Sequence, residues 1–144
     1  MIRTLAIAAT LIAGLAGTAL AQTACSCGSG TRVFPQAALA TFLGGRTACA
    51  ALGADRWQEF HSGSGTGGGP LIDWKRGSSS TTDPTETVGS WSIQGTGSSA
   101  KVRHSYTGGS SYDYEVCDGG GGVVRFCGAV NVNGTLLSGQ VACP

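Results

Sequence analysis

Three ionisable side chains, Glu59, His61 and Asp73, are spaced so that a single β-hairpin would bring them together. If His61 pairs with Leu71 in that hairpin, Glu59 lies opposite Asp73 on the same face. Opposed carboxyl groups beside an imidazole could bind a divalent metal ion or perform acid–base chemistry, including glycoside hydrolysis. The simpler interpretation is a solvated face whose charges are balanced by His61 and Lys75.

Six cysteines form the second candidate set. In an exported protein they would be oxidised and would most simply form three disulfides, which leaves no cysteine nucleophile. Metal binding is disfavoured because the close pair near the N-terminus has no second ligand pair. The predicted disulfide residues are Cys25, Cys27, Cys49, Cys117, Cys127 and Cys143.

Aromatic residues are the third candidate set. The set comprises the three tryptophans and Tyr106, Tyr112 and Tyr114, which form either the core or the wall of a small pocket for an apolar or carbohydrate ligand. A lone histidine at position 104 is expected in the core, hydrogen-bonded to a tyrosine at 106 or 114. The candidate ligand-binding residues are Trp57, Trp74, Trp91, Tyr106 and Tyr114.

Other motifs of catalysis are lacking. The glycine-rich run 63–69 has no Gly-Lys-Ser/Thr after it, and Pro70 leads into a strand rather than a helix, so it is no phosphate loop. There is no Gly-x-Ser-x-Gly nucleophile elbow. We therefore assign no catalytic residue and expect no cofactor.

The N-terminus has the features of a cleavable export signal. Arg3 precedes an apolar stretch at 5–15 that is too short to span a bilayer, and Ala19-Leu20-Ala21 fits a signal peptidase site. Cleavage near Ala21 would remove Arg3 and leave eight basic and eight acidic residues. This balance gives no long-range attraction for nucleic acid or anionic membranes, and we expect no membrane span in the mature chain.

We expect three segments: a signal peptide at 1–21, a cysteine-anchored tail at 22–34 and a single β-rich domain at 35–144. One short helix should begin at Pro35, with Leu39, Phe42 and Leu43 on its apolar face, and end at Gly44-Gly45. The alternative for this segment is a turn that leads into a strand. The remaining segments predict an all-β antiparallel meander of about eight strands that forms a small barrel or a sandwich. The expected strands are 46–51, 57–61, 71–76, 88–94, 100–106, 112–117, 123–132 and 135–142.

The register of the last four strands follows from matching their apolar faces. Pairing Tyr106 with Tyr112 places Val102 opposite Val116, and Asn133-Gly134 is a typical two-residue hairpin turn. In this register two cysteines lie on the charged face, too far apart to bond each other, and one lies on the apolar face. The disulfides expected from it are Cys49 with Cys127, and Cys25 and Cys27 with Cys117 and Cys143 in either order.

The motifs TAC, WQEFH, DWKRG, DPTETVGSW and FCG, between residues 47 and 128, resemble a largely uncharacterised family of small exported bacterial β-rich proteins. The step Gly89-Ser90-Trp91 is also similar to one found in small lipocalin-like and avidin-like barrels. The first resemblance implies export and a β-rich fold, and neither implies an activity.

We therefore favour a non-enzymatic, disulfide-bonded binding or interaction module that acts outside the cytosol on a small ligand or an extracytoplasmic partner. One alternative is a small extracytoplasmic enzyme or metal-dependent protein that uses Glu59, His61 and Asp73. Another is a structural component of the envelope or matrix, which near-zero net charge and Gly/Ser-rich loops would suit.

Overall fold

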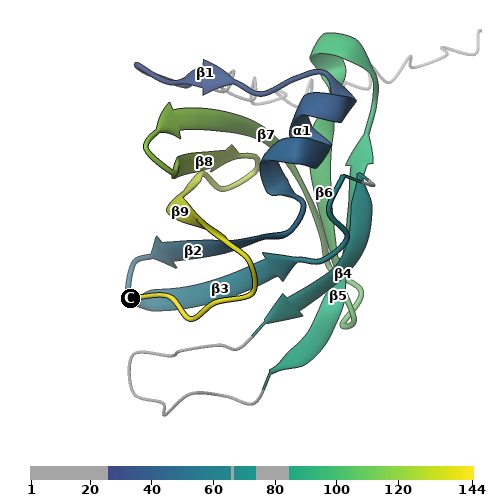
Figure 1. Ribbon diagram of the computed structural model, residues 1–144, viewed down its shortest axis with the longest axis vertical. Helices are drawn as coiled ribbons and strands as arrows, with labels where there is room; N and C mark the ends of the chain where they lie inside the picture. The colour runs from purple at the N-terminus through teal and green to yellow at the C-terminus, as the bar shows by residue number, and fades with distance from the viewer. Residues whose placement is uncertain (1–25, 66, 74–84) are drawn as a thin grey trace, which may run out of the picture.

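The computed structural model describes residues 26–65, 67–73 and 85–144 (Figure 1). The expected signal segment lies outside these ranges, as do Cys25, Trp74 and Lys75. The elements within them are β1 (Thr31–Arg32), α1 (Gln36–Leu43), β2 (Arg46–Leu52), β3 (Asp55–His61), β4 (Gly68–Asp73), β5 (Glu86–Gln94), the 3-10 turn η1 (Gly97–Ser99), β6 (Lys101–Tyr106), β7 (Ser111–Gly120), β8 (Val123–Cys127) and β9 (Val132–Ser138).

Strands β2 to β9 form an eight-stranded closed barrel (Figure 1). Each strand is antiparallel to the next in sequence, and β9 returns to pair with β2, which closes the sheet. The predicted all-β meander is confirmed, and of the two architectures considered the barrel is the one formed. A barrel of eight strands has an interior that side chains can fill or that can hold one small ligand.

The predicted β3–β4 hairpin is confirmed residue by residue. Glu59 pairs with Asp73, Phe60 with Ile72 and His61 with Leu71. The predicted β6–β7 register is wrong by two residues, because Tyr106 closes the connecting turn by donating its N–H to the carbonyl of Ser110. A two-residue shift leaves every side chain on its predicted face, since the side-chain period of a strand is two.

The hairpin predicted at Asn133-Gly134 is not formed, because both residues lie inside β9. Asn133 pairs with Arg125 and Gly134 with Val124. A Cβ on Gly134 would collide with the backbone carbonyl of Cys49. The glycine therefore permits the close approach of β2 and β9 rather than a turn.

Two disulfides join described residues, Cys27 to Cys117 and Cys49 to Cys143. The predicted Cys49–Cys127 pair is wrong, and Cys143 does not lie on the apolar face. After β9 ends, the C-terminal segment runs back along the outside of the barrel, where the N–H of Cys143 donates to Oε1 of Gln58. Cys127 is disulfide-bonded too, and its partner lies outside the described residues.

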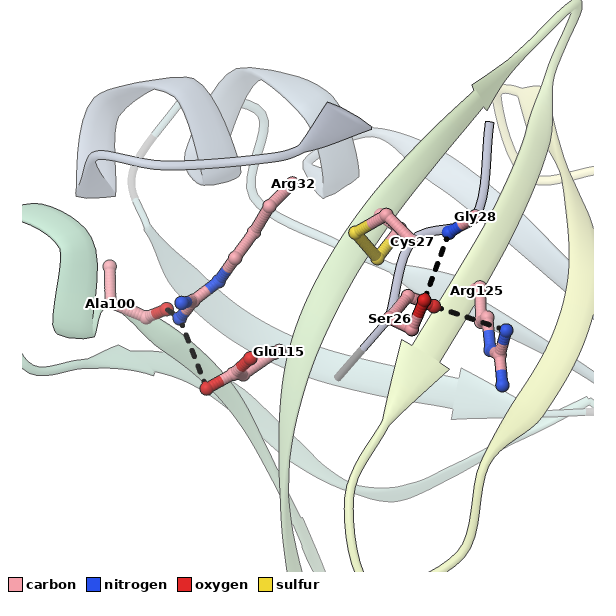
Figure 2. The surroundings of a disulfide bond; sticks show 8 residues. Ser26, Cys27, Gly28, Arg32, Ala100, Glu115 and Arg125 are labelled. Atoms are coloured by element: carbon pink, nitrogen blue, oxygen red, sulfur yellow. Dashed lines mark hydrogen bonds and ion pairs between the residues drawn. A yellow bond between two sulfur atoms is a disulfide. The ribbon is translucent and has the colours of Figure 1, made fainter. Parts of the chain in front are cut away.

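The segment before α1 is held by more than its cysteine. Strand β1 pairs with the C-terminal half of β7, where Arg32 lies opposite Cys117. It therefore forms an outer strand beside the barrel. The guanidinium of Arg32 lies 3.3 Å from the carboxylate of Glu115, and the Cys27–Cys117 disulfide lies next to this pair (Figure 2). A two-residue strand is too short to be recognised from alternation of side chains.

Helix α1 packs on β2, β5 and β6 near one end of the barrel. As predicted, the helix follows Pro35 and buries Leu39 and Leu43 completely. The apolar residues packed with them at this end include Leu71, Trp91, Val102, Val116, Val124 and Leu136. We call this end of the barrel the filled end. The candidate site lies at the opposite end.

Candidate functional site

A cavity of about 800 Å³ occupies the barrel at the end away from α1. Every barrel strand from β2 to β9 contributes at least one lining residue. The cavity opens to solvent past Leu52 and Tyr112, each 45% exposed, and past Val130. Its volume lies within the range of small-molecule sites.

The space exists because β2 places small side chains inward. Ala48 and Ala50 line the cavity, while Cys49 between them points outward to its disulfide. Larger aliphatic residues at these two positions would project into the cavity. In the sequence these two alanines indicate only an apolar strand, so they do not by themselves predict a cavity.

Five aromatic side chains from four strands line the cavity. Tyr112 and Tyr114, on one face of β7, have ring planes within 21° of each other and centroids 6.4 Å apart. Tyr106 on β6 meets Tyr112 edge to face at 6.0 Å. Trp57 on β3 and Phe126 on β8 complete the wall. Such rings offer apolar contact area together with phenol and indole polar groups.

At the deep end of the cavity lies a buried polar cluster, which we define as Glu59, His61, His104 and Tyr106. The hydroxyl of Tyr106 donates to Oε1 of Glu59 at 2.6 Å. Oε2 of Glu59 lies 3.5 Å from Nδ1 of His104, whose Nε2 lies 3.0 Å from Nε2 of His61. Glu59, His61 and His104 are 6%, 0% and 3% exposed.

Burial raises the pKa of Glu59 to about 7, because removing a carboxylate from water is costly. The hydrogen bond from Tyr106 acts against this rise, and the nearby carboxylate of Asp73 adds to it. Burial also raises the pKa of Tyr106, and the neighbouring Glu59 raises it further. Tyr106 is therefore a hydrogen-bond donor throughout the physiological range.

Both histidines are neutral near pH 7. Burial lowers the pKa of His61 to about 4, and burial together with the adjacent His61 holds the pKa of His104 well below its usual range. One Nε2 must then donate and the other accept. If His104 donates, its Nδ1 presents a lone pair to Glu59, and a protonated carboxyl group complements that lone pair. The cluster can thus keep one proton on Glu59.

The environment predicted for the β3–β4 face is wrong. Glu59, His61 and Asp73 share one face as expected, but this face is the barrel interior rather than solvent. The cause is β6, which supplies His104 and Tyr106 as partners inside the barrel. Within the described ranges, no three or more His, Cys, Asp or Glu side chains are grouped to hold a metal ion.

The other candidates are placed as follows. His104 is buried as predicted, but its hydrogen-bond partner is His61, and Tyr106 and Tyr114 touch only its ring. Trp57, Tyr106 and Tyr114 line the cavity. Trp91 does not line it: this residue is 1% exposed and packs edge to face against His61.

Several lining residues were missed by sequence reasoning. Tyr112 belongs to the aromatic set considered for a pocket wall, and its alternation with Tyr114 could have placed it among the candidate ligand-binding residues. Glu86, at the start of β5, was not considered because it falls in a polar stretch of the sequence. Val130 lies in the loop that replaces the expected Asn133-Gly134 hairpin.

Comparisons with protein-family models, curated proteins and solved structures find no match to this chain. The described part of the chain contains no helix that is long and apolar enough to cross a membrane. The disulfides fit an oxidising environment outside the cytoplasm. Functional inference therefore rests on the geometry of the cavity.

Proposed function

We propose that this chain is a binding protein whose barrel holds one small ligand with an apolar body. The observation that carries the proposal is the cavity of about 800 Å³ beside a well-packed filled end. A purely structural barrel has no need of such a space, since unfilled volume costs stability. The aromatic and aliphatic lining residues would supply the apolar contact area, and the buried polar cluster would orient one polar group of the ligand.

Export belongs to this proposal. The segment 1–21 would act as a signal peptide cleaved near Ala21, and the mature protein would work in the periplasm or outside the cell. Its disulfides suit such a location. The motifs between residues 47 and 128, which resemble those of small exported bacterial proteins, also support export.

Titration with the neutral fluorophore N-phenyl-1-naphthylamine tests binding, because its emission rises in an apolar site. Wild-type protein should show saturable enhancement with one site per chain. Ala50→Leu should abolish it by projecting into the cavity, and Ala51→Leu, one residue further along β2, should not. Thermal melts check that both variants fold. Equal binding by the wild type and Ala50→Leu, or no binding by the wild type, would exclude the cavity as a ligand site.

A second candidate function is proton-transfer catalysis, favoured by the pKa of Glu59 near 7 at the wall of an apolar cavity. A general acid or base works best when its pKa is close to the operating pH. Deuterium exchange at the carbons next to the carbonyl of 4-phenylbutan-2-one, followed by mass spectrometry, tests this function. The wild type should accelerate exchange and Glu59→Gln should not. Equal rates in the two proteins would remove the enzyme candidate.

A further inference from the structure

We propose that the ligand is an organic cation, with an ammonium group carried on an apolar body. This inference rests on the proposed binding function and names the chemical class of its ligand. It follows from how charge and aromatic surface are distributed around the cavity.

One side of the cavity wall is acidic. Glu59, Asp73 and Glu86 line it from the adjacent strands β3, β4 and β5. No Lys or Arg occurs among the described lining residues. Carboxylates gathered in a concave, partly apolar site focus a negative potential into it, which attracts cations and repels anions.

The adjoining side of the wall is lined by three tyrosines. Tyr106 on β6, and Tyr112 and Tyr114 on β7, follow the acidic strands around the barrel. Their ring faces attract a cation placed within about 6 Å of the centroid, by roughly 0.5–2 kcal/mol each as solvent is excluded. An ammonium group between the two sides would meet both a carboxylate and π faces.

The buried polar cluster gives the cation a specific partner. Among the described residues, the titratable side chains that line the cavity or belong to the buried polar cluster with Glu59 are His61 on β3, Asp73 on β4, Glu86 on β5, His104 and Tyr106 on β6, and Tyr112 and Tyr114 on β7. None of these is cationic at neutral pH. A bound ammonium group would replace the proton of Glu59 as its counter-charge, so binding should release a proton near pH 7.

Three probes that share one skeleton test the sign of the charge: 4-phenylbutan-1-amine, 4-phenylbutan-1-ol and 4-phenylbutanoate. At pH 8 we expect the amine to bind at least about tenfold more tightly than the alcohol, and the carboxylate more weakly than both. Glu59→Gln should bring the amine to within about threefold of the alcohol. Glu115→Gln, which removes a carboxylate outside the barrel, should keep the wild-type preference.

The pH dependence supplies a second readout. With Glu59 titrating at about 7, amine affinity should fall about 90-fold from pH 8 to pH 5, because protonated Glu59 must first lose its proton. Alcohol affinity should change little over this range. The amine should lose most of its pH dependence in Glu59→Gln, which has no carboxyl to titrate.

The outcomes separate this inference from the proposed function. If the alcohol or the carboxylate binds as tightly as the amine, the cation inference is wrong while the binding function stands. If none of the three probes binds and N-phenyl-1-naphthylamine does not bind either, the binding function itself fails. Amine binding that is equally strong in Glu59→Gln would also overturn the assignment of Glu59.

Discussion

Replacing Glu59 by glutamine should make the barrel more stable at pH 8, although the residue is buried and hydrogen-bonded. Glutamine has the shape of a protonated glutamate. Its oxygen can still accept from Tyr106, and its amide can donate to Nδ1 of His104. The variant therefore keeps the cluster in the form that burial favours, at every pH.

The magnitude follows from the pKa of Glu59, about 7 in the folded protein against an ordinary value of 4.5. Below pH 4.5 both the folded and the unfolded wild type hold the proton. Between 4.5 and 7 only the folded state holds it, so the free energy of unfolding falls by about 1.4 kcal/mol per pH unit. Above pH 7 the loss is complete and amounts to about 3 kcal/mol.

The assay is urea denaturation of both proteins under non-reducing conditions, at intervals from pH 4.5 to 8.5. Both proteins contain His61 and His104, so the difference between their unfolding free energies isolates the carboxyl group. That difference should move by about 3 kcal/mol in favour of Glu59→Gln as the pH rises. Glu86→Gln, at an exposed position of the mouth, should stay within about 0.5 kcal/mol of the wild type throughout. A difference that is flat with pH, or that moves the other way, would refute the account of the buried polar cluster.

Three further substitutions test the packing of the barrel by urea or thermal unfolding. Gly134→Ala should lower the free energy of unfolding by about 2 kcal/mol or more, because its Cβ would collide with the backbone of Cys49. The control Gly108→Ala has open space around it and should lower that free energy by less than about 0.5 kcal/mol. Equal losses in the two variants would contradict the close approach of β2 and β9. Converting Cys49 and Cys143 together to serine should lower the unfolding free energy by about 4 kcal/mol, because their disulfide closes a loop of 94 residues. An unchanged unfolding free energy would show that this disulfide does not stabilise the fold. Trp91→Phe should cost about 2 kcal/mol by removing a buried indole hydrogen bond and leaving a gap, and a cost near zero would contradict its placement in the core.

The local pairing of neighbouring strands could be predicted from the sequence. Alternation of side chains and short connections were enough to pair Glu59 with Asp73 and to place Tyr106 and Tyr114 on one face. The register across a turn was harder to predict, because a turn can change its length by two residues while every side chain stays on the same face of the sheet. Gly134 misled the prediction because a glycine needed for close backbone approach looks in the sequence like one needed for a turn.

The candidate site could be predicted only in part. Its acidic side was visible in one hairpin, but the sequence does not show that β6 would bring His104 and Tyr106 against Glu59. Polar residues on alternate positions are typical of an exposed face. Only the closed barrel, in which such residues are satisfied by one another, makes them an interior cluster.

The central claim is that the open half of the barrel, and not its surface, binds a small ligand. The most direct measurement is a titration of 15N-labelled protein with 4-phenylbutan-1-amine, followed by two-dimensional NMR. The amide signals of Ala48, Ala50, Glu59 and Tyr114 should shift together to saturation, while those of Val124 and Leu136 at the filled end should stay in place. Shifts confined to outward-facing residues, or spread evenly over both ends of the barrel, would contradict the account.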